Sequence, residues 1–207
     1  AYENAKTYAH ERVQGTNISK IRDLNAQRVS IIEHPAVRLN LFNMKSRVEA
    51  MRALIYYTAF EFDLERIAET EDEKELRQNM IDLLTPMCKG WCTEVGLEVV
   101  QTGLQVMGGV GYTKDFPLEQ LYRDARISTI YEGTTDIQAL DLIGRKILRN
   151  EGALFQLLMG HFSELINEHK DHEEIGQLIN IFEGYCELLY ETSMSTQEIL
   201  KERGMES

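Results

Sequence analysis

The chain has 207 residues, is 43% hydrophobic and carries a formal net charge of −12. A chain of this size can bury one good core, or one core with a small appendage. The negative charge argues against binding to nucleic acid or to an anionic membrane surface, because both need clustered Lys and Arg. The sequence shows no run of 18 apolar residues and no signal peptide. We therefore expect no membrane span and a cytoplasmic protein.

Few prolines and few alternating apolar and polar stretches occur, so we predict an all-α chain. A helical pattern covers residues 1–13 and begins so abruptly that the chain looks like part of a longer protein. A polar loop over about 14–33 leads to Pro35, which suits the first turn of a helix. One long helix is then predicted over about 35–69, on a core-facing stripe formed by Val37, Leu41, Met44, Val48, Met51, Leu54 and Ile55, with Phe62 and Ile67 beyond it.

The acidic stretch from Glu69 to Glu73 predicts a turn, followed by a third long helix up to Met107. Pro86 should kink this helix, because it removes one backbone donor. A glycine-rich stretch ends it, a short helix follows at about 117–127, and another begins near Thr134 or Thr135. Residues 1–150 are therefore predicted to form an up-and-down antiparallel helical bundle.

Two more amphipathic stretches, at about 153–171 and 174–202, predict a helical C-terminal extension over residues 151–207. This extension holds 12 acidic against 3 basic residues. We interpret its charge as the solvated face of amphipathic helices rather than a docking surface.

No metal site is expected. Cys88 and Cys92 lie four residues apart on one helix face, where burial as small apolar residues is the favoured interpretation. The extension holds three histidines and two nearby glutamates, but their spacing fits a polar helix face and lacks a tight ligand pair such as HExxH.

Tyr131-Glu132-Gly133-Thr134 is the most informative segment of the chain. Glu132 falls between an irregular stretch and a helix, since downstream apolar residues recur at helical spacing. A carboxylate at such a joint can point into a cleft. Burial in an apolar cleft raises the pKa of a glutamate and makes it a useful general base near neutral pH.

Three glycines occur within four residues, at Gly108, Gly109 and Gly111. Glycine commonly ends a helix in the left-handed conformation. Three exceed what a helix end needs, and the alternative use of glycine is close approach of the backbone to a ligand.

Residues 105–138 resemble the C-terminal signature of the acyl-CoA dehydrogenases, flavoenzymes that desaturate acyl-CoA thioesters. The resemblance joins three blocks in the order and at the spacing of that family: Gln105-x-x-Gly108-Gly109-x-Gly111-Tyr112, Arg123-Asp124-Ala125 and Ile130-Tyr131-Glu132-Gly133-Thr134. The start of the long helix and the extra C-terminal helices look most like a longer-chain subfamily that includes 3-methylmercaptopropionyl-CoA dehydrogenases.

The resemblance implies that Glu132 removes the α-proton of the acyl thioester while FAD accepts the β-hydride, with Tyr131 and Gly133 beside the substrate. It also implies that the backbone N–H of Glu132 and a flavin hydroxyl polarise the thioester carbonyl. The acceptor of the electrons would be an electron-transfer flavoprotein. The family's N-terminal helical domain and middle β domain do not match any part of this chain, so we expect little or no activity from it alone.

The resemblance also implies cofactor contacts. Gln105, Gly108 and Gly109 match positions that touch the flavin held by the partner subunit of a homodimer or tetramer, and Arg12 matches an arginine that reaches a flavin pyrophosphate across the dimer. Thr134 and Asp136 match positions that touch the flavin of their own subunit. The chain departs from many relatives at Gln14, His34-Pro35 and Asp136.

Two alternatives stay open. An acyl-CoA oxidase shares the flavin and the glutamate but passes electrons to oxygen. A non-enzymatic helical oligomerisation module also fits the isolated chain. The acyl chain length of the substrate does not follow from this sequence, because the depth of the pocket depends on side chains of the other domains.

Overall fold

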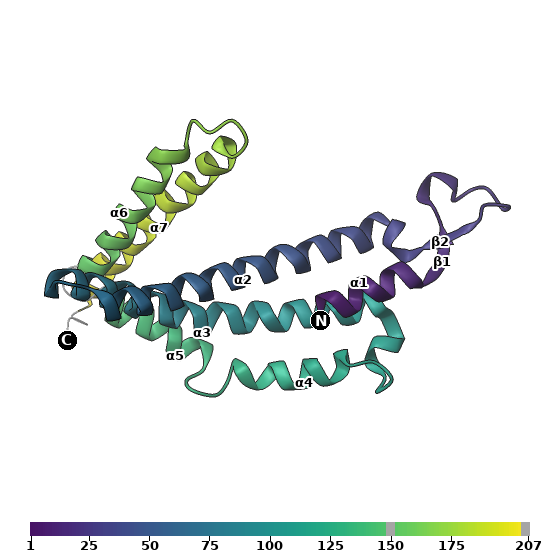
Figure 1. Ribbon diagram of the computed structural model, residues 1–207, viewed down its shortest axis with the longest axis horizontal. Helices are drawn as coiled ribbons and strands as arrows, with labels where there is room; N and C mark the ends of the chain where they lie inside the picture. The colour runs from purple at the N-terminus through teal and green to yellow at the C-terminus, as the bar shows by residue number, and fades with distance from the viewer. Residues whose placement is uncertain (148–151, 204–207) are drawn as a thin grey trace. The chain divides into compact units, whose positions relative to one another are not determined.

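The computed structural model describes residues 1–147 and 152–203, and helices make up most of it. This confirms the predicted all-α class. The α-helices are α1 (Tyr2–Glu11), α2 (Pro35–Ile67), α3 (Glu71–Met107), α4 (Leu118–Ser128), α5 (Thr135–Leu140), α6 (Ala153–His169) and α7 (Gly176–Glu202) (Figure 1). Short 3₁₀ turns form η1 (Ile18–Lys20), η2 (Ile31–Glu33) and η3 (Gly108–Tyr112), and η4 (Asp141–Ile147) is a π-helix.

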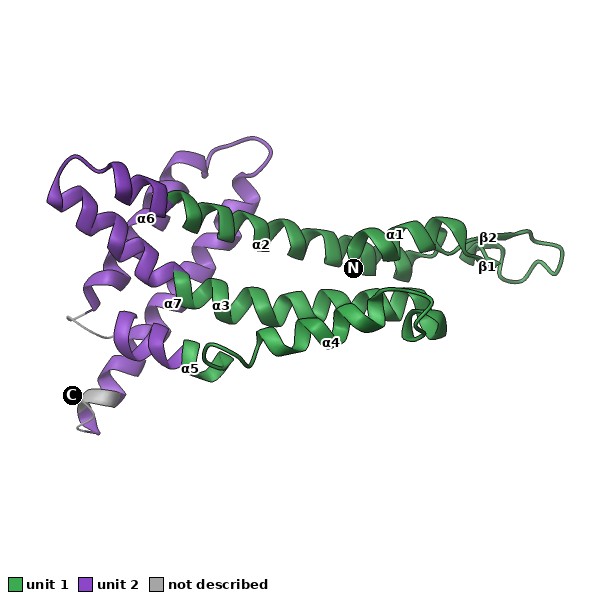
Figure 2. Cartoon of the chain, turned by 60° about the horizontal axis from the view of Figure 1, so that its bottom comes forward, with its two compact units in different colours: residues 1–60, 85–138 green, residues 61–84, 139–207 purple. Residues whose placement is uncertain are grey.

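The chain divides into two compact units (Figure 2). Unit 1 comprises residues 1–60 and 85–138, and unit 2 comprises residues 61–84 with the chain from residue 139 onward. Both long helices, α2 and α3, contribute residues to each unit. The domain boundary predicted at residue 150 lies outside the described residues and stays a prediction.

A small β-hairpin occupies the segment that the sequence predicted to be a polar loop. Strand β1 (Val13–Thr16) pairs antiparallel with β2 (Arg28–Ser30). Strands of three and four residues are too short to show an alternating pattern, so the sequence did not reveal them. The Nε2 atom of His34 donates a hydrogen bond to the carbonyl oxygen of Gln14 at 2.8 Å, which ties β1 to the start of α2.

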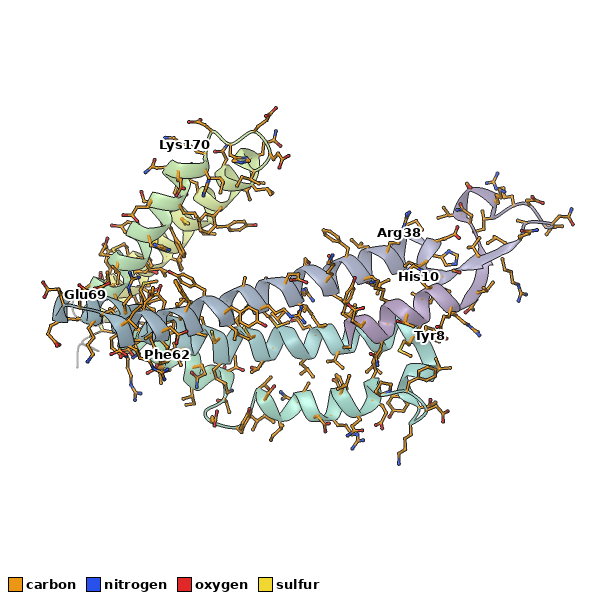
Figure 3. The ribbon with its side chains drawn as sticks, viewed as in Figure 1. Tyr8, His10, Arg38, Phe62, Glu69 and Lys170 are labelled. Atoms are coloured by element: carbon orange, nitrogen blue, oxygen red, sulfur yellow. The ribbon has the colours of Figure 1, made fainter. Side chains whose placement is uncertain are left out.

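The core of unit 1 forms where α1, α2 and α4 approach α3. A Cβ atom built on Gly103 of α3 would lie 2.8 Å from Leu118 of α4, 3.2 Å from Met44 of α2 and 3.8 Å from Ala5 of α1. All three of these neighbours are buried. Glycine therefore lets three helices meet at one point of α3, and Tyr8 of α1 adds an edge-to-face contact with Phe116, at 5.8 Å between ring centroids (Figure 3).

The apolar stripe predicted on α2 is buried only in part. Leu41 and Met44 are buried as expected, but Ile55 is exposed, as are Phe62 and Ile67 beyond the stripe. The prediction was wrong for Ile55, because apolar spacing marks one face of a helix but does not say how far along the helix a partner covers that face. In α3, Pro86 lies inside one continuous helix, and the predicted kink there stays a prediction.

Unit 2 contains a hairpin of α6 and α7. Phe155 of α6 is fully buried and stacks on Tyr190 of α7, and Phe162 meets Phe182 edge to face with ring centroids 5.2 Å apart. None of the described helices combines the length and the apolar character that a membrane span requires.

Unit 2 also holds a buried ion pair. Glu61 of α2 has a side chain only 2% exposed, and its Oε2 atom lies 3.3 Å from Nη1 of Arg77 on α3. Moving a charge from water into the protein interior costs free energy. The folded state therefore loses stability if a buried carboxylate loses the cation that pairs with it.

Replacing Arg77 with Met should lower the free energy of unfolding by about 3–5 kcal/mol, because it leaves the Glu61 carboxylate buried without a partner. Urea unfolding followed by circular dichroism measures the change. Arg66→Met is the matched control, since Arg66 and Asp63 form an exposed pair 3.9 Å apart that should contribute less than about 1 kcal/mol. Equal effects of the two variants would contradict the prediction.

Candidate functional site

Glu132 lies in a tight turn between the end of α4 and the start of α5. Its φ angle is 54°, and it is the only non-glycine residue with a positive φ among those the structure describes. Gly133 follows with a φ of 90°. A left-handed conformation costs an L-residue roughly 1–2 kcal/mol, so it persists only where the surroundings hold it.

Gly133 has a geometric reason to be glycine. A Cβ atom built on it would lie 3.0 Å from Nε2 of Gln138 and 3.3 Å from Cγ2 of Ile137, in addition to the strained φ. The Glu-Gly order that the sequence singled out therefore corresponds to two successive left-handed residues that reverse the chain before α5.

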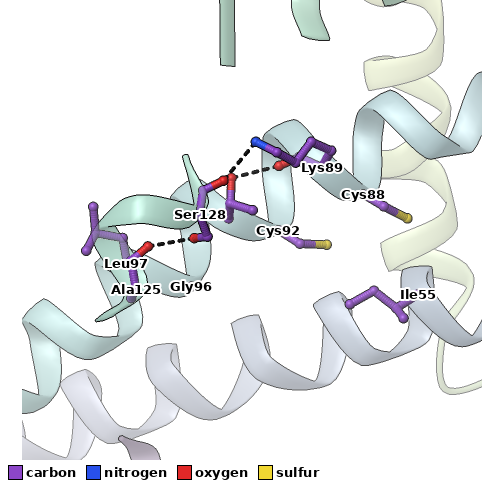
Figure 4. Close-up of a pocket in the computed structure, with 9 residues that line it drawn as sticks. Ile55, Cys88, Lys89, Cys92, Gly96, Leu97, Ala125 and Ser128 are labelled. Carbon is purple, nitrogen blue, oxygen red and sulfur yellow. Dashed lines mark hydrogen bonds between the residues drawn. The ribbon is translucent and has the colours of Figure 1, made fainter. Parts of the chain in front are cut away.

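Lys89 of α3 fastens this turn. Its Nζ atom donates to the carbonyl oxygens of Ser128 at 2.8 Å and of Gly133 at 3.1 Å, and it lies 5.6 Å from the centre of the Tyr131 ring. Figure 4 shows the bond from Lys89 to Ser128. One partly buried ammonium group thus joins the end of α4 to the residue after Glu132.

Two further hydrogen bonds hold the other side of the turn. Nε2 of Gln138 donates to the carbonyl oxygen of Glu132 at 3.1 Å. The hydroxyl of Thr135 donates to Oε1 of Glu94 on α3 at 2.6 Å, which fixes the first residue of α5. The backbone on both sides of Glu132 is therefore tied to α3 or to α5.

The carboxylate and the backbone N–H of Glu132 have no partner among the described residues. Its side chain is exposed, and no described residue forms a hydrogen bond or an ion pair with its carboxylate. Its backbone N–H also lacks an acceptor among the described residues. The turn thus presents a free carboxylate and a free N–H donor from one residue, and no apolar cleft of unit 1 encloses them.

A pocket of about 470 Å³ lies on the other side of Lys89, between α2, α3 and α4 (Figure 4). It is lined by Ile55, Cys88, Lys89, Cys92, Thr93, Gly96, Leu97, Ala125 and Ser128. Burial raises the pKa of the Cys92 thiol to about 11, and the neighbouring Cys88 adds to this effect. Neither cysteine is in a disulfide, and both contribute their side chains to the lining of the pocket.

The predicted cofactor residues fall into two groups. Thr134 and Asp136 lie on the Glu132 turn and in the first turn of α5, and both are exposed. Gln105 lies near the end of α3 and is separated from Lys89 by 16 positions of one helix, a distance of about 24 Å. Gly108 and Gly109 follow Gln105 in η3, so the structure does not bring all the predicted residues together.

The backbone of η3 is open, and Arg12 after α1 is an unpaired cation among the described residues. A Cβ atom on Gly108 or Gly109 would meet nothing within 4 Å, so the neighbouring chain does not require glycine at Gly109, whereas Gly108 has a φ of 66°. Arg12 follows α1, is exposed, and makes no side-chain hydrogen bond or ion pair with the described residues. Open backbone and a free guanidinium suit a ligand with phosphate groups.

Sequence reasoning missed the residues that hold the turn, Lys89, Glu94 and Gln138. Glycine after glutamate signalled an unusual backbone, but Lys89 lies 44 residues from Gly133 in the chain. No short-range pattern identifies such a partner. Among the described residues, no cluster of three metal-binding side chains occurs.

The family model described as "Acyl-CoA dehydrogenase, C-terminal domain" matches residues 5–148 of this chain. The chain is 44% identical over 153 residues to 3-methylmercaptopropionyl-CoA dehydrogenase of Ruegeria pomeroyi, covering 73% of this chain and 25% of that protein. It is 39% identical over 168 residues to a broad-specificity linear acyl-CoA dehydrogenase of Mycobacterium tuberculosis, covering 80% of this chain and 27% of that protein. The chain thus spans about a quarter of the length of these relatives.

The fold has a counterpart among solved structures. The structure of Caenorhabditis elegans ACDH-11 in complex with C11-CoA aligns with a TM-score of 0.78 and 21% identity, over 95% of this chain and 30% of that one. The likeness extends over α6 and α7 as well as the bundle, because nearly the whole chain is covered.

The raised pKa of Cys92 predicts slow alkylation. Because the thiolate is the reactive form, its rate with iodoacetamide should rise about tenfold for each pH unit from pH 8 to pH 10, whereas an ordinary thiol levels off near pH 9. Peptide mass spectrometry separates Cys92 from the other two cysteines. A rate that is already constant above pH 9 would contradict the assignment.

Proposed function

Because the chain belongs to the acyl-CoA dehydrogenase family, as its C-terminal domain, we propose that it carries the catalytic base of a flavin-dependent acyl-CoA dehydrogenase. Glu132 is the proposed base for α,β-desaturation of an acyl-CoA thioester. The other domains of such an enzyme would complete the flavin and substrate sites, so this chain alone should have little or no activity.

The observation that carries the proposal is the geometry of the Glu132 turn. A left-handed residue held from both sides presents an unpaired carboxylate and an unpaired N–H. A reaction that removes a proton next to a thioester carbonyl needs these two groups: a base for the proton and a donor for the carbonyl oxygen.

In the proposed reaction the Glu132 carboxylate takes the α-proton of the acyl chain. The thioester oxygen accepts a hydrogen bond from the N–H of Glu132, which makes that proton more acidic. Bound FAD supplies the acceptor for the β-hydride. Tyr131, half exposed beside the base, and Gly133, which has no side chain, would border the substrate. Substrate and neighbouring domains would supply the desolvation that this chain does not provide.

The cofactor contacts proposed for this chain fit its exposed groups. Arg12 would pair with the pyrophosphate of FAD, and Gln105, Gly108 and Gly109 would let the dinucleotide approach the backbone of η3. Thr134 and Asp136 would contact a flavin near the base. Arg12 is exposed in this chain, in which the family departures Gln14 and His34 are joined by a hydrogen bond from the His34 ring to the Gln14 carbonyl oxygen.

A homodimer or tetramer is part of the proposal. The two groups of cofactor residues lie at opposite ends of the α3–α4 pair, which suits contacts to two flavins, one held by each subunit. Large apolar side chains are also exposed along the unit 1 part of α2, as an interface or a neighbouring domain would require: Leu39, Phe42, Ile55, Tyr56 and Phe60. An electron-transfer flavoprotein is the proposed electron acceptor.

Replacing Glu132 with Gln in the full gene product should leave flavin and acyl-CoA bound but slow flavin reduction by about 10²–10⁴-fold. The amide keeps the size of the side chain and removes its basicity. Rapid mixing with acyl-CoA, followed at the flavin absorbance band, measures the rate.

Glu49→Gln is the matched control for that experiment, because Glu49 is an exposed glutamate of α2 with only a 3.8 Å contact to Arg52. It should reduce flavin at the wild-type rate. If Glu132→Gln also does so, Glu132 is not the base and the proposed function fails. Rapid reoxidation of the reduced flavin by oxygen, with oxygen consumed and no other acceptor added, would indicate an oxidase.

Replacing Gly109 with Ala separates a structural role of η3 from a cofactor role. The added Cβ meets nothing in the chain, so the melting temperature without flavin should not change. Flavin affinity should fall by about 1–3 kcal/mol if the dinucleotide packs against this backbone. Calorimetric titration with FAD tests this, and unchanged affinity would remove Gly109 from the cofactor site.

A further inference from the structure

We propose that Lys89 is a positioning residue for the base, which sets the direction of the Glu132 carboxylate and N–H by holding the left-handed turn. The inference rests on the proposed function of Glu132. The structure assigns Lys89 this role because it contacts the turn's backbone and makes no contact with the Glu132 side chain itself.

The backbone at Glu132 sets the point and the direction from which its side chain leaves the turn. No described residue bonds the carboxylate, so within this chain the φ of 54° and the position of the Cα atom are what place the base. A peptide free to relax would leave the left-handed region. Whatever fixes the carbonyl groups on both sides of Glu132 therefore also fixes the base.

Lys89 is placed to fix both of these carbonyl groups. It bonds Ser128, the last residue of α4, and Gly133, the residue directly after Glu132. One acceptor precedes the turn and the other follows Glu132, so the ammonium group of Lys89 joins the two ends of the turn by hydrogen bonds. The charge makes both bonds stronger than those of a neutral donor.

The cation has no competing partner. Lys89 forms no ion pair with a carboxylate among the described residues, and its remaining contact is with the ring of Tyr131, the residue before Glu132. Its stem crosses the edge of the pocket that Cys92 and Leu97 line, so α3 anchors it on one side (Figure 4). The residues directly before and after Glu132, Tyr131 and Gly133, thereby both contact one side chain of α3.

The test uses Lys89→Met and Lys89→Arg in the full gene product, with Lys45→Met as the control, since Lys45 is an exposed lysine of α2 without an ion pair among the described residues. Met keeps the length of the stem and loses the donors, whereas Arg keeps the charge and the donors. We expect Lys89→Met to slow flavin reduction about 100-fold, the effect of displacing a reacting group by about 1 Å. Arg should restore most of the rate, and Lys45→Met should not change it.

The dissociation constants for FAD and for an unreactive acyl-CoA analogue distinguish positioning from general damage. They should stay within about threefold of wild type in Lys89→Met, because only the reacting geometry changes. Hydrogen exchange of the 207-residue chain gives a readout that needs no flavin. In Lys89→Met the amides of Ile130 and Tyr131, which both donate to the carbonyl oxygen of Ile127, should exchange at least tenfold faster, while those of the α2 and α3 core exchange as in wild type.

Each other result overturns the inference. A Lys89→Met enzyme that reduces flavin within about threefold of wild type, while Glu132→Gln does not reduce it, removes Lys89 and leaves the proposed function standing. Glu132→Gln reducing flavin normally overturns both. Faster exchange throughout unit 1, or lost flavin binding without rescue by Arg, would show that Lys89 stabilises the fold and does not specifically position the base.

Discussion

Unit 1 depends on the burial of α3, because every other part of the site is packed on it or bonded to it. Ala5, Met44 and Leu118, from three different helices, converge on Gly103, where the absence of a side chain permits the approach. Residues of α3 such as Val99 belong to the same buried cluster. A helix buried on several sides is a rigid reference for the loops that contact it. The Glu132 turn is positioned by its hydrogen bonds to this helix, through Lys89 and Glu94.

The site uses backbone conformation where many active sites use side-chain contacts. In the proposed reaction the carboxylate and the N–H of Glu132 both meet the substrate, and among the described residues neither has a partner that could hold Glu132 in place. Glu132 is instead held through backbone carbonyl groups. Those of Ser128 and Gly133 accept hydrogen bonds from Lys89, and that of Glu132 accepts one from Gln138. Strain at one residue is thus offset by hydrogen bonds made by its neighbours.

The sequence predicted the helices well and the way they are held together poorly. Local signals marked Pro35 at the start of α2 and Gly108 at the end of α3. The sequence did not predict the hairpin of β1 and β2. Its strands are short, and one of its contacts is the hydrogen bond from His34 to Gln14, 20 residues earlier in the chain. The motif around Glu132 is local, so the sequence alone pointed to that residue. The same pattern gave no sign of Lys89, since contacts over 44 residues leave no local periodicity.

Glu132 is exposed because the chain contacts the backbone of its turn and not its side chain. A base works best when water is excluded around it, yet unit 1 surrounds only the backbone of the turn and leaves the carboxylate exposed. If Glu132 is the base, α3 and Lys89 would position it, and the substrate and other parts of the enzyme would have to exclude water around it. Such a base would be positioned before substrate arrives and would lose its water only when the cleft closes over it. Proton removal would then be confined to the complex in which the hydride acceptor is also in place, which protects the reactive α-carbon from water.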